Sequence, residues 1–252
     1  MSAISFILLI SGIKKSKKLQ KYNNHKGLNE RMPGYQVRLG LGLHLGYAIE
    51  GAIGSYYKID ASYLSPNVRM AERLEAATKF FGVPLLISGA LWKYFTRKTR
   101  DYCRQVDYCT MAGNKEPVKL FTIDVDSSQL AVEEDHKELN SKQQKIKRVS
   151  QRIKRNNLRT AAFANDLQIS ESFESNLDIK LMRQPYTKEF YEAYNNGFKL
   201  YVAGKWEEAK EQFDKVLEII PADKPTKNLI DHMEQTSMQP PPNWKGHKFF
   251  AE

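Results

Sequence analysis

The first clear pattern in the chain is an alternation of apolar and other residues in the stretch YQVRLGLGLHLG. One face of this stretch carries an apolar side chain at every second position: Val37, Leu39, Leu41, Leu43 and Leu45. A period of two residues predicts a β-strand. The next stretch, YAIEGAIGSYYKID, contains Gly51 and Gly54 and predicts two strands joined by a tight turn.

A helical period follows over residues 66–81. Pro66 and Asn67 suit the first turn of a helix, and Gly82 suits its end. The spacing predicts one apolar stripe, made of Val68, Ala71, Leu74, Ala77 and Phe81.

Short apolar runs come next. VPLLIS predicts a buried strand, GALWKYFT a short helix, and YCRQVDYCTM with PVKLFTIDVD a closing strand pair around AGNKE. Strands interleaved with helices predict an α+β domain, with a layered α/β arrangement as the alternative.

The last part of the chain has a helical period again. One predicted helix carries Phe190, Tyr194, Phe198 and Tyr201 on a single face; the next carries Trp206, Ala209, Phe213, Val216, Leu217 and Ile220. Gly204 separates them, Pro221 ends the second, and a third helix is expected over residues 225–236. Ala209-x3-Phe213 followed by Pro221 is typical of a tetratricopeptide-like hairpin, although a generic helical hairpin fits as well. One such repeat cannot bury its face alone, so we expect it to pack on the first domain or on a partner.

Charge is concentrated in two basic runs within a chain of formal net charge +10. The first is Lys14, Lys15, Lys17, Lys18, Lys21 and Lys26; the second, which has no acidic residue in it, is Lys142, Lys145, Lys147, Arg148, Arg152, Lys154, Arg155 and Arg159. Such runs attract nucleic acid, anionic lipid or acidic protein surfaces, or else form a solvated linker helix. Cys103 and Cys109 are six residues apart with no CxxC pair, so a reducing compartment is expected.

The N-terminal apolar run of about ten residues is too short to span a bilayer. Lysines follow it, whereas a secretory signal carries its positive charge in front. We therefore expect a cytoplasmic protein, with a ciliary location as an alternative, and membrane contact through this segment remains open.

Residues 23–126 resemble the C-terminal half of a class III adenylate/guanylate cyclase catalytic domain. The ordered motifs VRLGLGLHLGYAIEGAIGS, ASYLSPNVRMAERLEAATKFFGVPLLIS and VDYCTMAGNKEPVKLFTIDV carry the resemblance, and the DASYLSPNV wording resembles cyclases of protists, ciliates included. About 100 of the 252 residues are covered. The resulting division is an N-terminal segment (1–22), the partial cyclase domain (23–126), a charged linker (127–184) and a tetratricopeptide-like tail (185–252).

The resemblance implies dimers of catalytic domains with active sites shared across the interface. It also implies two-metal chemistry, in which paired aspartates hold the ions. Both metal-binding motifs of the family precede the matched part, so no metal ligand is predicted, and Mg or Mn with ATP or GTP would need aspartates from a partner. Four other carboxylates are expected to be ordinary turn or hairpin groups: Asp60, Asp107, Asp124 and Asp126.

The family's Asn-x3-Arg pair maps onto Arg69 and Arg73. Arg73 matches the transition-state arginine, whereas Arg69 replaces the ribose-orienting asparagine and cannot accept a hydrogen bond. Both could meet phosphate from one helix face, or both could simply face solvent. Ser62 occupies the purine-reading position, and Lys115 lies one position late for the phosphate lysine of the closing hairpin. His44 is expected to be structural.

Three hypotheses follow. The chain is a catalytically incomplete cyclase-type protein, a pseudoenzyme acting through protein interaction; or it is an active nucleotide cyclase once a partner chain completes the site; or it is an adaptor of a large assembly such as a ciliary complex. Nucleic-acid binding is disfavoured because aromatic residues are not interleaved with the basic runs. If the lost half left a sheet edge exposed, that edge would invite pairing with another chain.

Overall fold

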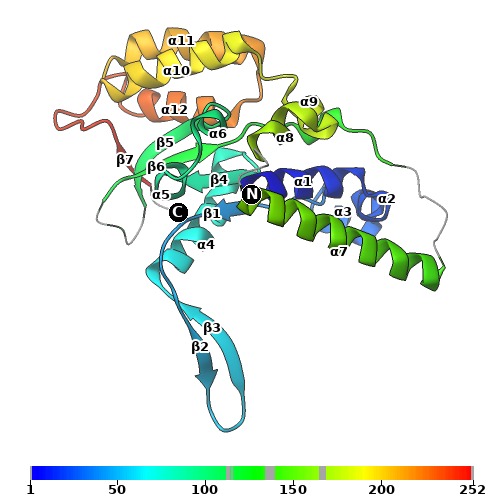
Figure 1. Cartoon of the computed structure of the whole chain (residues 1–252). Helices are drawn as coiled ribbons and strands as arrows, with labels where there is room; N and C mark the ends of the chain where they lie inside the picture. Colours follow the sequence, from blue (N-terminus) through cyan, green and yellow to red (C-terminus); the bar gives the residue numbers. More distant parts are fainter. Residues whose placement is uncertain (1, 112–113, 115, 134–139, 165–168, 251–252) are drawn as a thin grey trace. The chain divides into compact units, whose positions relative to one another are not determined.

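The computed structural model describes residues 2–111, 114, 116–133, 140–164 and 169–250. These residues form two compact units. Unit 1 combines Met1–Arg38 with Asp126–Met182, and unit 2 combines Leu39–Val125 with Arg183–Glu252. Figure 1 labels the elements of both. Each unit is therefore built from two stretches that are far apart in the sequence.

Unit 1 is helical in the part that the structure describes. Its elements are α1 (Ser2–Lys15), α2 (Lys17–Gln20), η1 (Lys21–Asn24), α3 (Lys26–Arg31), η2 (Ser127–Gln129), α7 (Ser141–Phe163), η3 (Ile169–Glu171), α8 (Ser172–Ser175) and α9 (Leu177–Arg183). The first apolar run is thus a helix. The Ser11 hydroxyl at 2.7 Å and the Lys15 ammonium at 3.1 Å both bond Asp178, which joins α1 to α9. None of the described helices is long and apolar enough to cross a membrane.

Unit 2 holds the sheet, whose strand order is β1-β4-β6-β5-β7. Its elements are β1 (Leu41–Leu43), β2 (Ile49–Gly54), β3 (Ile59–Leu64), α4 (Pro66–Phe81), β4 (Leu85–Ser88), α5 (Gly89–Trp92), α6 (Arg97–Arg100), β5 (Arg104–Met111), β6 (Val118–Thr122), α10 (Lys188–Val202), α11 (Trp206–Ile219), α12 (Lys224–Glu234) and β7 (Lys248–Phe250). β1–β4 and β5–β7 are parallel, whereas β4–β6 and β5–β6 are antiparallel. The sheet is mixed, and the predicted α+β class is confirmed.

The strand predicted over Val37–Leu45 is shorter than expected, because only Leu41–Leu43 pairs. The alternation of glycine and leucine in this strand is explained by how the strand packs. A Cβ atom on Gly42 would lie 2.2 Å from the backbone oxygen of Ala71 in α4, so glycine is required where the strand meets the helix. Leu43, on the other face, is buried.

Helix α4 has the predicted length, and Ser65 caps its first turn by accepting from the Asn67 amide. Gly82 ends it with φ +63°. The predicted stripe is wrong at Val68, which is 41% exposed. The buried face is formed by Met70, Leu74, Ala77 and Phe81. Val68 is two residues from Met70, and two residues turn the helix by about 200°, so it points away from that face.

The predicted hairpin and closing strand pair are both present, as β2–β3 and β5–β6. The strand β7 was not predicted. It comes from the last residues of the chain and pairs with β5 at Cys109 to Met111. Trp244 holds this segment against the end of α10, because its indole N–H donates a hydrogen bond to the Val202 carbonyl at 3.1 Å.

Helices α10 and α11 bury most of their predicted stripes, with Leu217 and Ile220 only partly buried, and the expected third helix is present as α12. Phe190, Tyr194, Tyr201, Trp206, Ala209 and Phe213 are fully or almost fully buried in one cluster. Helices α10 and α11 approach closely at Gly197, where a Cβ atom would lie 2.8 Å from the Phe213 ring. The likeness to a tetratricopeptide repeat stays a prediction.

A buried arginine links these helices to the sheet. The Arg104 guanidinium, with 1% of its side chain exposed, lies 2.6 Å from Asp124 and 2.9 Å from Asp223. It also lies over the rings of Phe190 and Tyr194, at 5.0 and 4.4 Å from the centroids. Asp223 is the N-cap residue of α12, so one cation joins β5, the end of β6, α10 and α12.

We predict that Arg104→Met lowers the free energy of unfolding by about 3–5 kcal/mol, because it leaves two carboxylates buried without a cation. Urea titration measures the loss. The matched control Lys210→Met removes an exposed pair with Asp214 and should change stability by less than about 1 kcal/mol. Adding Asp124→Asn and Asp223→Asn to Arg104→Met should restore part of the lost free energy of unfolding. Equal stability of the wild type and Arg104→Met would refute the stabilising role of Arg104.

We also predict a pH effect centred on His232. Burial, followed by the charge of Lys248, lowers its pKa from 6.5 to about 4. The unfolded chain therefore binds the proton at a higher pH than the folded one, so stability falls as the pH is lowered from about 6.5 towards about 4. His232→Gln, which keeps an acceptor for Tyr201, should flatten this part of the profile. Identical slopes for the two proteins in urea titrations across this range would contradict the assignment.

Candidate functional site

The arginines identified in the sequence lie on α4 in unit 2. Arg69 is exposed in the first turn, and Arg73 is half-buried one turn later. A separation of four residues places both on one helix face, with about 5–6 Å between Cβ atoms. Within the described residues neither arginine has a carboxylate partner, so both charges are available to an anion.

Ser62 lies on β3, opposite Gly51 of β2, and is half-buried. It is three residues before Ser65, the cap of α4. No hydrogen bond joins Ser62 to Arg69 or Arg73 in the described part of the chain. The fourth predicted residue, Lys115, lies outside the described residues.

A polar network holds the start of α4 to the sheet. His44 bonds the Ser88 hydroxyl through Nδ1 at 2.7 Å and the Asn67 side-chain oxygen through Nε2 at 3.1 Å. Asn67 also donates to the Tyr47 carbonyl at 2.8 Å. Because the side-chain oxygen of Asn67 can only accept, Nε2 of His44 donates to it. The contacts support the structural interpretation of His44.

This network does not resemble a nucleophilic site, although it contains a serine beside a histidine. Ser88 is 0% exposed, and its hydroxyl oxygen accepts from the Leu91 amide as the cap of α5. Burial raises the pKa of the Cys103 thiol to about 12. At neutral pH that thiol is protonated and therefore a poor nucleophile.

The carboxylates do not fit a divalent metal. Asp107 and Asp124 are buried, not in surface turns as expected. The Lys248 ammonium lies 3.0 Å from Asp107, and Arg104 holds Asp124. Asp60 pairs with Lys58 at 2.9 Å, and Asp126 caps η2 in unit 1. No group of three metal-ligating side chains exists among the described residues, so we derive no metal-dependent step.

The ion pairs lower at least one acidic pKa. Burial alone would raise the pKa of Asp223, but the charge and hydrogen bonds of Arg104 and the hydrogen bonds of Thr226 outweigh it, and the pKa lies below the usual 3.8. Asp223 is therefore an anion matched to a cation, which is a structural role and not that of a general base.

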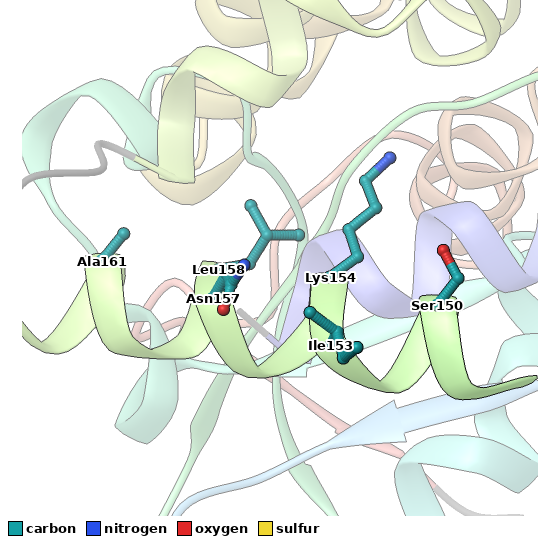
Figure 2. Close-up of a pocket in the computed structure, with 6 residues that line it drawn as sticks. All are labelled: Ser150, Ile153, Lys154, Asn157, Leu158 and Ala161. Carbon is teal, nitrogen blue, oxygen red and sulfur yellow. The ribbon is translucent and has the colours of Figure 1, made fainter.

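A shallow hollow lies in unit 1, along α7. Its lining comes from one helix: Ser150, Ile153, Lys154, Asn157, Leu158 and Ala161. Figure 2 shows Lys154 and Leu158 extending in the same direction from successive turns. The hollow contains none of the residues matched to the cyclase motifs.

Several residues with defined roles were missed from the sequence. Asn67 was identified only as a helix starter, and Arg104 and Asp223 were not singled out. Asp223 and Pro225 do carry an N-cap signal for α12. Nothing local pairs Arg104 with Asp223, which is 119 residues away.

Comparison with known proteins gives limited support for a family. No family model matches the chain. An adenylate cyclase of Anabaena cylindrica is 23% identical over 107 residues, which is 42% of this chain and 21% of that protein. The chain thus spans about a fifth of the length of the relative it matches. Together with the mixed sheet, this similarity supports a cyclase-like domain in the chain.

Proposed function

We propose that this chain acts through its cyclase-like domain by binding a second cyclase-like domain, and that it does not complete a nucleotide cyclase site alone. The observation that carries the proposal is the β2–β3 hairpin. Among the residues that the structure describes, these strands pair only with each other, and Figure 1 shows the hairpin extending away from the five-stranded sheet.

The hairpin is unusually apolar for a segment in water. Exposed large side chains line both of its faces and its tip: Ile49, Ile53, Tyr56, Tyr57, Ile59, Tyr63 and Leu64. A two-stranded hairpin alone is marginally stable, and several large apolar side chains exposed on one element mark a candidate protein interface. A matching hairpin on a second copy offers such a surface, which agrees with the dimers that the cyclase resemblance implies.

Incomplete catalysis is supported by the residues of α4 and of the sheet. Arg69 stands where the resemblance calls for asparagine, and the buried aspartates are neutralised by Arg104 and Lys248. Arg73 favours the second function, an active cyclase with a partner, because it keeps the arginine position on the same face of α4. Such an arginine neutralises charge that develops on phosphoryl oxygens.

The adaptor hypothesis depends on helices α10–α12. Their aromatic stripe is buried inside unit 2, so this face is not free to bind a partner. Only the outer, charged faces of these helices could serve an adaptor, and no feature there selects a ligand. We therefore place the partner site on the hairpin.

We predict that the purified chain self-associates and that Ile49→Ser with Ile53→Ser, two changes on one face of β2, lowers the association constant at least about tenfold, because each change removes apolar area from the interface. Sedimentation equilibrium measures this. A control with Lys188→Ser and Lys205→Ser changes two exposed helix residues and should associate like wild type. A monomeric wild type at all concentrations would argue against the hairpin as a self-association site.

We predict no cyclic nucleotide from the chain alone with ATP or GTP and Mn²⁺ or Mg²⁺. If a cyclase domain bearing the metal aspartates is added and product appears, Arg73→Ala should reduce the rate about 10²-fold, as expected for loss of a charge-stabilising group. Lys79→Ala, at the other end of α4, is the control. Product from the chain alone would overturn the proposal of an incomplete site.

A further inference from the structure

Helix α7 in unit 1 is exposed from Ser141 to Thr160 and half-buried only at Ala161 and Ala162. It has 23 residues, none of them buried, and is therefore about 34 Å long. Asn140 and Gln143 form a capping box at its start. A capped helix that covers no core has a surface available for a partner.

The charge of this helix selects an anionic partner. Eight cations lie on it without an acidic residue: Lys142, Lys145, Lys147, Arg148, Arg152, Lys154, Arg155 and Arg159. Unit 1 as a whole holds 18 of the 39 Lys and Arg residues but only 10 of the 29 Asp and Glu residues. A net +8 of the chain's +10 therefore lies in this unit.

The apolar side chains of α7 form a separate stripe. Ile146, Val149 and Ile153 follow the i, i+3, i+7 spacing and are 60%, 51% and 55% exposed. At about 100° per residue, Lys142 lies in line with the stripe, Lys145, Arg152 and Arg159 follow it on one side, and Lys154 lies on the other side. Arg148 and Arg155 lie on the opposite face, with Lys147 next to them.

We propose that α7 binds the surface of an anionic lipid bilayer, with the stripe in the headgroup region and the flanking cations at the lipid phosphates. A helix that combines a broad basic face with a narrow apolar stripe binds membranes in this way, and long Lys and Arg side chains reach back to the charged layer. A nucleic acid would engage the face of Arg148 and Arg155 and leave the stripe in water. The exposed ring of Phe163 lies on the stripe side of α7 and not on that arginine face, so it does not supply a base-stacking surface there.

The hollow along α7 fits the same ligand. Ser150, Lys154 and Asn157 supply a hydroxyl, an ammonium and an amide beside apolar Ile153 and Leu158 (Figure 2). A lipid presents the matching combination of a phosphate and an acyl chain. A polyanion without apolar groups would leave Ile153 and Leu158 without a partner.

The test uses the full chain and vesicles of phosphatidylcholine, alone or with about 30% phosphatidylserine, in a flotation assay. We expect binding only to the anionic vesicles, weakened as salt rises from about 0.1 M to about 0.5 M. No binding to anionic vesicles would overturn the proposal. So would a 20-nucleotide RNA or an acidic peptide bound more tightly than the vesicles.

Two variants of equal charge separate a membrane from other polyanions. Lys145→Gln and Arg152→Gln together remove flanking cations and should reduce partition at least about tenfold. Arg148→Gln and Arg155→Gln remove the same charge from the opposite face and should reduce it less than about threefold. The reverse order would overturn the proposal in favour of a partner on the arginine face.

A third variant tests the stripe. Ile146→Ser, Val149→Ser and Ile153→Ser keep all charges and should also reduce partition at least about tenfold, because the apolar insertion is lost. Unchanged partition would overturn the inserted geometry. All the substituted residues are exposed, so circular dichroism should show a folded chain for each variant.

Discussion

The Arg104 guanidinium is the interaction on which unit 2 depends. A buried cation is tolerated only when carboxylates and aromatic faces replace its water. Asp124 comes from the end of β6, Asp223 from the start of α12, and the rings of Phe190 and Tyr194 from α10. If any of these groups moved away, a buried charge would be left without a partner. The sheet and the C-terminal helices are therefore one structure, not a domain followed by an independent tail.

The C-terminal segment strengthens this connection in a second way. It passes over α10 at Trp244, pairs with β5 through β7 and brings Lys248 to the buried Asp107. Phe250 then joins the core formed by α4 and the sheet. The helix that carries Arg69 and Arg73 is thus packed on a core that includes residues from the end of the chain. Residues from the C-terminal end of the chain therefore form part of the core beneath α4.

The surfaces left for partners follow from this packing. The aromatic stripes of α10 and α11 are used internally, whereas the β2–β3 hairpin and helix α7 are not covered by their own units. The two differ in chemistry: the hairpin is mainly apolar, and α7 is strongly basic with a narrow apolar stripe. A protein that binds another domain through the first and an anionic surface through the second would localise an interaction without needing a complete active site.

Elements with local signals could be predicted from the order of residues. The period of two predicted the strand that contains β1, Gly51 and Gly54 predicted the β2–β3 pair, and short apolar runs predicted the β5–β6 pair. The period of 3.6 predicted α4, α10 and α11, and Gly82 marked a helix end. Sequence reasoning also identified Arg69, Arg73 and the structural role expected of His44. The folded chain was needed to show that Asp107 and Asp124 are buried ion-pair partners, that Arg104 meets Asp223, and that residues 248–250 form a strand. Those outcomes depend on groups brought together from distant parts of the chain. Burial sets the free-energy cost of a charge and its need for a partner, and no local sequence pattern reports which side chains become buried.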